Sequence, residues 1–240
     1  AATVGTNSYR ELSAGLRGGQ DNVRYALGVS HTNDKGFSAT NPTVPFGNYN
    51  PDRDGFRQKA LNASVDWQLN SDWKLSAGAL YSDGTNHFDD GLGADTQSDA
   101  RTTVLRAGVE GRITPDWTTR LNYNQGTDRS NAVVSAIPTS IPGLFETQQD
   151  QWTWQNDVKT PVGTVVAGAE TLLQKVNSST AYTVTERRIN AVFAGLSGTA
   201  SGHSWQLNAR RDDNSQFGGS STGYAGYGYQ FNPNWRAHAG

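Results

Sequence analysis

Hydrophobic and polar residues alternate with a period of two along most of the chain. In residues 59–69 one parity is apolar and the other is polar, and the same alternation resumes over 73–82 after the polar triplet 70–72. The apolar parity of the first segment is Leu61, Ala63, Val65, Trp67 and Leu69. Period-2 alternation is the signature of a half-buried β-strand, and a three-residue polar connection predicts a hairpin.

The same unit recurs and predicts about twelve strands. They lie near 8–17, 23–32, 59–69, 73–82, 102–113, 117–125, 148–158, 164–174, 188–197, 203–211, 221–231 and 235–240. All eight Pro residues fall between these segments, where no ladder hydrogen bond is needed. No helical period of 3.6 is present, so the sequence predicts an all-β antiparallel fold; the phase of the alternation is ambiguous only near 188–197.

Short and long connections alternate strictly between the predicted strands. The short ones are 18–22, 70–72, 114–116, 159–163, 198–202 and 232–234, and the long ones are 33–58, 83–101, 126–147, 175–187 and 212–220. Every short turn therefore lies at one end of the sheet and every long loop at the other. A Trp begins or closely follows the start of a strand after four of the short turns, at positions 73, 117, 205 and 235.

Two interpretations fit this pattern. In a soluble β-protein the apolar parity packs a core, whereas in a transmembrane barrel it faces lipid and the polar parity lines a wet lumen. Strands of about ten residues, aromatic residues at the strand ends and the asymmetry of the connections are typical of outer-membrane barrels. The lipid-facing barrel is therefore favoured.

Composition narrows the function classes. The chain has 240 residues, a mean hydropathy of −0.65 and a formal net charge of −2. The near-neutral charge gives no electrostatic reason to expect nucleic-acid binding, and the absence of Cys excludes disulfides and thiolate sites. No apolar run is long enough for a transmembrane helix. The four His residues are scattered and no nucleophile-elbow or zinc motif is present, so no enzyme activity and no catalytic residue is predicted.

Acidic residues gather in two neighbouring long loops. The first loop carries Asp52 and Asp54 in the run Asn-Pro-Asp-Arg-Asp-Gly, and the second carries Asp89, Asp90 and Asp95. Carboxylates that converge from two loops suit calcium, which takes several oxygen ligands in flexible geometry. The alternative is that these residues are solvated or cap turns, which is the commoner role of Asp in loops.

Several loop and hairpin sequences of the chain resemble those of a known family. The run 211–218, Arg-Asp-Asp-Asn-Ser-Gln-Phe-Gly, is similar to a segment that follows a barrel strand in the TonB-dependent cobalamin transporters of the outer membrane. The loop segments 52–56 and 85–89, and the pair Asp95-Thr96, resemble loops of that family as well. The order of strands, short turns and loops can be followed from about residue 8 to residue 240.

The resemblance implies a 22-stranded barrel that closes around a plug and takes up cobalamin with energy from TonB. It also implies calcium ions that order the extracellular loops, with Asp52 and Asp54 as an Asp-x-Asp-Gly pair and Asp89 and Asp95 as the acidic positions of the second loop. Phe88 stands at an aromatic substrate-contact position that is usually Tyr. Where the family has a further Asp in the first loop, this chain reads Gly-Phe-Ser at 36–38.

We therefore expect residues 1–240 to form one incomplete domain of a barrel in the outer membrane of a Gram-negative bacterium, without plug and C-terminal strands. The expected partners are outer-membrane lipid, TonB through the plug and a small-molecule chelate. The alternatives are a TonB-dependent siderophore receptor, a self-contained twelve-stranded pore or outer-membrane enzyme, and a soluble β-rich binding protein. The predicted final strand, 235–240, is shorter than the 9–11 residues that cross a membrane, which argues against the self-contained ring.

Overall fold

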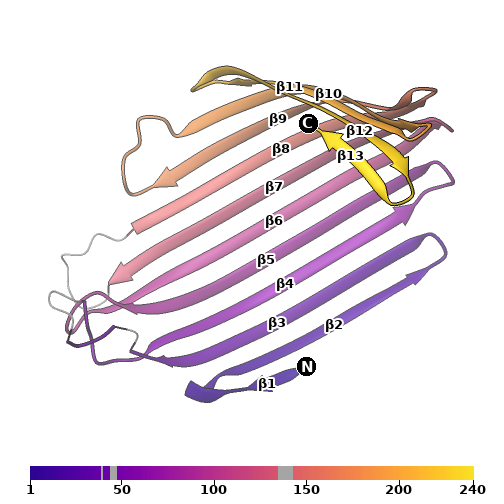
Figure 1. Cartoon of the computed structure of the whole chain (residues 1–240). Helices are drawn as coiled ribbons and strands as arrows, with labels where there is room; N and C mark the ends of the chain where they lie inside the picture. The colour runs from indigo at the N-terminus through magenta and orange to yellow at the C-terminus, as the bar shows by residue number, and fades with distance from the viewer. Residues whose placement is uncertain (39, 44–47, 135–142) are drawn as a thin grey trace.

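The computed structural model describes residues 1–240 except 39, 44–47 and 135–142. Its described residues form one sheet of thirteen antiparallel strands, and each strand pairs with the next one along the chain (Figure 1). The predicted all-β antiparallel meander is therefore confirmed. In the described part of the chain, no helix is long and apolar enough to cross a bilayer.

Most of the strands are longer than the alternation predicts. They are β1 (Ala2–Val4), β2 (Arg10–Gln20), β3 (Val23–Phe37), β4 (Asp54–Gln68), β5 (Trp73–Asp89), β6 (Asp95–Thr114), β7 (Trp117–Val134), β8 (Gly143–Thr160), β9 (Gly163–Ser178), β10 (Glu186–Ala200), β11 (His203–Asn214), β12 (Gly218–Asn232) and β13 (Trp235–Ala239). A single-turn 3-10 helix at Thr6–Ser8 separates β1 from β2.

Two expectations are corrected here. The count is thirteen rather than about twelve, because the three-residue β1 is too short to show an alternation. Most strands also run past their predicted ends at the long-loop side; β5 ends at Asp89 instead of residue 82. Beyond the apolar band both faces of the sheet are polar, so the hydrophobic signal stops while the hydrogen-bonded ladder continues, as in the pairing of Asp83 with Arg101.

The asymmetry of the connections is confirmed only in part, because the β11–β12 connection, predicted as the long loop 212–220, is the three-residue turn 215–217. The turns at one end contain two to four residues, at 21–22, 69–72, 115–116, 161–162, 201–202 and 233–234. The β3–β4 connection at the other end spans 38–53, whereas the β5–β6 connection is only 90–94 because the strands extend into the predicted loop. Trp73, Trp117 and Trp235 are the first residues of β5, β7 and β13, directly after short turns.

The large apolar side chains of the strands are exposed rather than packed in a core. Leu61, Val65 and Trp67 are 38%, 40% and 45% exposed. Among the described residues, the only apolar side chains that are buried are Ala94 and Ala191. A soluble protein of this size would bury a substantial core, so the interpretation that the apolar face meets lipid is supported and the soluble alternative is not.

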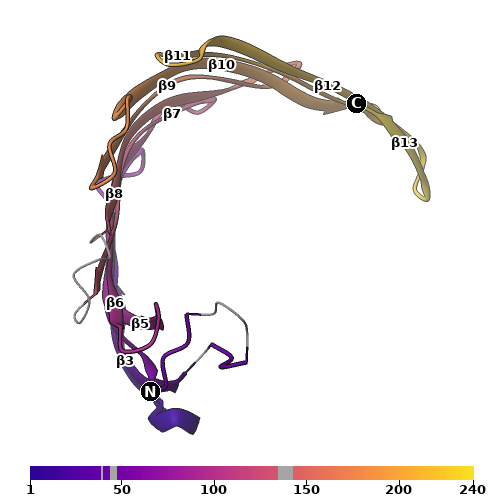
Figure 2. The same cartoon turned by 90° about the vertical axis from the view of Figure 1, so that its left-hand side faces the viewer.

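The sheet curves into an open arc (Figure 2). Strands β1 and β13 lie at its two ends and are not paired with each other. The chain therefore forms part of a barrel wall, and the alternative of a self-contained twelve-stranded ring is wrong for this structure. The described residues 40–43 and 48–53 of the β3–β4 connection lie on the concave side of the arc (Figure 2).

Candidate metal centre

The site is built where the β3–β4 loop meets the tip of the β5–β6 hairpin. The register of β3 against β4 shifts between Asp34 and Phe37, and Gly36 within this bulge has φ +64°. A Cβ at Gly36 would collide with the carbonyl oxygen of Asp54, so only glycine allows this approach. The bulge places Asp54 directly opposite Phe37 at the start of β4.

Three of the four predicted acidic residues come together. Asp52, Asp54 and Asp89 each offer one carboxylate oxygen, and these oxygens lie within 4.8 Å of one another. The Oδ2 atom of Asp89 accepts a hydrogen bond of 3.3 Å from the hydroxyl of Ser38. The Oδ1 atom of Asp89 is buried without a hydrogen-bond partner, which is costly for a charged oxygen.

Asp95, the fourth predicted residue, is placed by its backbone alone. Its Cα is paired with Asp89 as the last pair of the β5–β6 ladder. The side chain of Asp95 lies outside what the structure describes. Ser38, the serine of the Gly-Phe-Ser sequence, belongs to this cluster. Its hydroxyl contacts Asp89 and also the carbonyl oxygen of Asn50, the latter at 3.0 Å.

The electrostatics of the cluster disfavour three negative charges. Loss of water around the carboxylate raises the pKa of Asp52 above its ordinary value, and the charges of Asp54 and Asp89 raise this pKa further. Such repulsion is relieved by a proton or by a cation. The carboxylates therefore favour occupation by a positive ion.

Asn50 ties the two loops together, and sequence analysis assigned it no role. Its side-chain Nδ2 donates to the carbonyl of Ala94 at 3.1 Å, and its Oδ1 accepts from the backbone N–H of Gly93 at 3.0 Å. Asn50 is 8% exposed. The backbone N–H of Gly91 adds a bond of 3.0 Å to the carbonyl of Asn48. The amide pairs with backbone on the facing loop, so no local sequence pattern could have revealed it.

The donor set fits a hard divalent cation. Calcium binds oxygen ligands at about 2.3–2.6 Å, so two ligands on opposite sides of one ion are about 5 Å apart. The spread of 4.8 Å between the three carboxylate oxygens is within that limit. The unpartnered Oδ1 of Asp89 would gain a partner from such an ion. No nitrogen or sulfur ligand takes part in this cluster, which suits calcium rather than zinc.

Phe88, the predicted substrate-contact residue, lies one residue before Asp89 on β5. It is 36% exposed and its backbone pairs with Thr96. The hydroxyl of Thr96 is buried without a partner. Phe88 is thus an exposed aromatic residue adjacent in sequence to the metal centre, and its cross-strand neighbour carries an unsatisfied hydroxyl.

The segment that carries the family resemblance forms the β11–β12 hairpin. The side-chain Oδ1 of Asn214 accepts hydrogen bonds from the backbone N–H groups of Gln216 and Phe217, at 2.9 and 3.3 Å. Gly218 has φ +76° and starts β12. The Asn-Ser-Gln-Phe-Gly sequence is thus explained locally as the turn of a hairpin.

Comparison with known proteins agrees with this architecture. No family model matches the chain. The vitamin B12 transporter BtuB of Photobacterium profundum is 24% identical over 225 residues, which are 91% of this chain and 35% of that protein. The chain thus spans about a third of the length of this curated relative.

Solved structures show the same fold. The siderophore receptor PirA of Acinetobacter baumannii matches with a TM-score of 0.74 and 12% identity over 94% of this chain and 39% of its own. The ferripyoverdine receptor of Pseudomonas aeruginosa matches with a TM-score of 0.73 and 11% identity over 99% of this chain and 40% of its own. These proteins are named as a transporter and receptors rather than enzymes, and the fold is that of an outer-membrane receptor barrel.

Proposed function

We propose that this chain, part of a TonB-dependent receptor barrel in the outer membrane of a Gram-negative bacterium, serves the uptake of cobalamin through a protein whose extracellular loops are ordered by calcium. The observation that carries the substrate is the sequence similarity to a vitamin B12 transporter along 91% of the chain. Coupling to TonB through a plug inside the barrel is part of the same proposal.

Calcium is supported by the geometry of the loops. Asp52, Asp54 and Asp89 would hold the ion, with Asp95 as a further ligand, and the ion would neutralise carboxylates that otherwise repel one another. Two further residues support the site: Asn50 joins the two loops, and Ser38 orients the carboxylate of Asp89. The expected result is a rigid loop pair beside Phe88, the proposed contact to substrate.

The second candidate is a ferric siderophore receptor with the same barrel. It is favoured by the siderophore receptors among the structural neighbours, which match with TM-scores of 0.74 and 0.73. Their sequence identities of 12% and 11% support a shared fold and nothing about the substrate. Loop chemistry rather than the barrel separates the two candidates.

The decisive experiment measures binding of cyanocobalamin and of ferric siderophores to the intact protein by equilibrium dialysis, with calcium and with chelator. Cobalamin binding that weakens at least tenfold on chelation supports the proposal. Asp89→Asn should weaken calcium and cobalamin binding together, whereas Asp116→Asn, in a short turn, should change neither. Selective binding of a siderophore would replace the proposed substrate, and cobalamin binding insensitive to calcium would remove the metal from it.

A further inference from the structure

A hollow of about 510 Å³ lies near the short-turn end of β10, β11, β12 and β13. Its lining is rich in hydrogen-bonding side chains: Ser197, Thr199, Ser204, Gln206, Arg236 and His238. In the described part of the chain, no Asp or Glu lines it. A hollow of this volume is within the usual range for small-molecule sites, and its charged lining is purely cationic.

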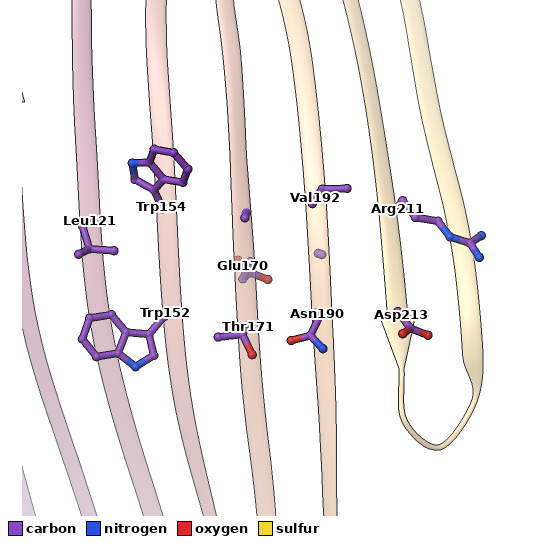
Figure 3. A pocket seen from close by; sticks show the side chains of 11 residues that line it. Leu121, Trp152, Trp154, Glu170, Thr171, Asn190, Val192, Arg211 and Asp213 are labelled. Carbon is purple, nitrogen blue, oxygen red and sulfur yellow. The ribbon is translucent and has the colours of Figure 1, made fainter. Parts of the chain in front are cut away.

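The hollow opens on the polar face of the sheet. Figure 3 shows the other, apolar face, with Trp152 and Trp154 on β8 and Val192 on β10. Ser197 follows Val192 by five positions on the same strand, so its side chain points to the opposite side of the sheet. In an outer-membrane barrel the polar face lines the lumen, and the short turns mark the periplasmic end. The hollow therefore lies on the lumen wall toward the periplasm.

A glycine allows Arg236 to reach across β12. Nη2 of Arg236 on β13 donates a hydrogen bond of 2.7 Å to the hydroxyl of Ser204 on β11. A Cβ at Gly228, on the strand between them, would lie 2.8 Å from that hydroxyl and 3.2 Å from Nη2. The hydroxyl of Ser204 in turn donates to the carbonyl oxygen of Gly228 at 3.3 Å. Ser204 and Gly228 thus hold the guanidinium group inside the hollow.

Arg236 has no carboxylate partner among the described residues. Its hydrogen bond to Ser204 is the one contact that its guanidinium makes there. By contrast, Arg210 on the same face is paired with Glu170 at 2.9 Å. Four more side chains of the lining make no hydrogen bond within the described residues: Ser197, Thr199, Gln206 and His238. The hollow therefore offers an unneutralised cation surrounded by unused hydrogen-bond donors.

We propose that this hollow binds the phosphodiester of the transported chelate as it moves along the lumen toward the periplasm. The inference rests on the proposed uptake of cobalamin, whose nucleotide arm carries one phosphodiester. The planar fork of Arg236 suits two phosphate oxygens, and Ser197 and Gln206 can donate to the same group. With one cation only, binding is weak, as a site on a transport path requires if the ligand is to leave it again.

The first test measures the site without any corrinoid. Dimethyl phosphate is titrated into the intact protein in detergent, and binding is read from phosphorus NMR. Arg236→Gln should bind at least tenfold more weakly than the wild type. Arg24→Gln is the matched control and should bind normally, because Arg24 is likewise the second residue of a strand after a short turn but lies on β3.

Two further variants separate the fork of Arg236 from its charge. Arg236→Lys keeps the charge but loses the paired donors, so its binding should lie between that of the wild type and that of Arg236→Gln. Gly228→Ala leaves Arg236 in place but crowds its guanidinium, and it should also weaken binding. Equal binding of dimethyl phosphate by Arg236→Gln and Arg24→Gln would overturn the proposal.

The second test follows transport in cells that contain TonB. Arg236→Gln should slow uptake of cobalamin at least threefold with unchanged binding at the cell surface. It should not slow uptake of cobinamide, the corrinoid without the nucleotide and its phosphodiester. Equal slowing of both corrinoids would overturn the proposal.

Three other outcomes are equally informative. Tighter binding of inorganic phosphate than of dimethyl phosphate would show a free-phosphate site, and no binding of dimethyl phosphate by the wild type would show that another part of the protein fills the hollow; either result overturns the proposal. If the wild type took up neither corrinoid, the proposed substrate would fail, and the titration with dimethyl phosphate would still support or overturn the phosphodiester site.

Discussion

The side chain of Asn50 donates a hydrogen bond of 3.1 Å to the carbonyl oxygen of Ala94, across 44 positions of sequence and between two separate loops. Both residues are buried, as are Thr85 and Thr96 on β5 and β6. A buried amide with both its donor and its acceptor used fixes the relative position of the loops. The metal centre depends on this contact because Asp52 lies in the β3–β4 loop whereas Asp89 is the last residue of β5.

Replacement of Asn50 by Ala should loosen the metal centre. It removes two hydrogen bonds and leaves Gly93 N–H and Ala94 C=O unpaired, at a cost of about 1–3 kcal/mol for opening of the loops. Hydrogen exchange at Gly93 should accelerate accordingly, and protease cleavage within 38–53 should increase. Asn48→Ala is the matched control, since Asn48 takes part through its backbone carbonyl alone. Equal exchange in both variants would show that Asn50 does not hold the loops.

The stability of the closed loops should depend on pH with opposite signs in the absence and presence of calcium. The pKa of Asp52 is raised in the folded cluster, so its charged form is disfavoured there relative to the open loop. Without calcium, closure should therefore strengthen as the pH falls from 7 through the raised pKa. With calcium, protons compete with the ion, and affinity should fall by up to about tenfold per pH unit per proton bound. Hydrogen exchange against pH, with calcium and with chelator, measures both slopes, and Asp52→Asn should flatten both.

The orientation of the sheet in the membrane predicts unequal tolerance of charge. Val65 is exposed on the apolar face, between Tyr25 and Ala77 on the neighbouring strands. Val65→Arg should destabilise the membrane-folded state by about 2–4 kcal/mol near the midplane, and by less toward the interface. Ser76→Arg is the control on the other face, where Asp66 is its cross-strand neighbour. Urea titration of the intact protein in vesicles compares the two, and equal losses would contradict the assigned faces.

Much of the sheet could be predicted from sequence because period-2 alternation reports directly which side chains meet lipid. The hairpin that joins β4 to β5 was predicted to within a residue or two at its turn end for this reason. Strand β10 was harder, since the run Ala191 to Ala194 is apolar at every position. The structure resolves its phase through cross-strand packing: Val192 is 60% exposed, whereas Phe193 lies 6.0 Å from the guanidinium of Arg210 on the other face.

The metal centre was predicted only as a set of carboxylates. Asp52, Asp54 and Asp89 stand out because acidic residues are dense in both loops, and loops joined to adjacent hairpins meet at the same end of a sheet. Asn50 and Ser38 do not stand out, since their roles depend on which backbone atom of the other loop they face. The glycine bulge at Gly36, which aligns Asp54, is visible only as a register shift between paired strands.

Phe88, the residue before Asp89 on β5, should respond to a single added hydroxyl. Phe88→Tyr keeps the ring, which is 36% exposed, and adds a hydrogen-bonding group at its tip. If Phe88 contacts the substrate, one new hydrogen bond of about 0.5–1.5 kcal/mol should tighten binding by about two- to tenfold. Phe217→Tyr, in the β11–β12 hairpin and 72% exposed, is the control. Equilibrium dialysis of cyanocobalamin measures the difference; a change of equal size in both variants would remove Phe88 from the binding surface.

Ser38 offers the sharpest test of the metal centre, because its hydroxyl already lies against the carboxylate of Asp89. Ser38→Asp would place a fourth carboxylate beside Asp52, Asp54 and Asp89. Without calcium the added charge should increase repulsion and open the loops, whereas with calcium it should supply another ligand and tighten binding by about tenfold or more.

The opposite responses to one substitution separate a metal site from a hydrogen-bonded turn. If Asp89 were held only by the hydroxyl of Ser38, Ser38→Asp would destabilise the loops whether or not calcium is present. Ser38→Ala is the matched control, because it removes the same hydrogen bond without adding charge and should weaken closure modestly in both conditions. Calorimetric titration with calcium, together with cleavage rates in 38–53, distinguishes these cases; a Ser38→Asp variant with unchanged or weaker calcium affinity would refute the assignment of these carboxylates as calcium ligands.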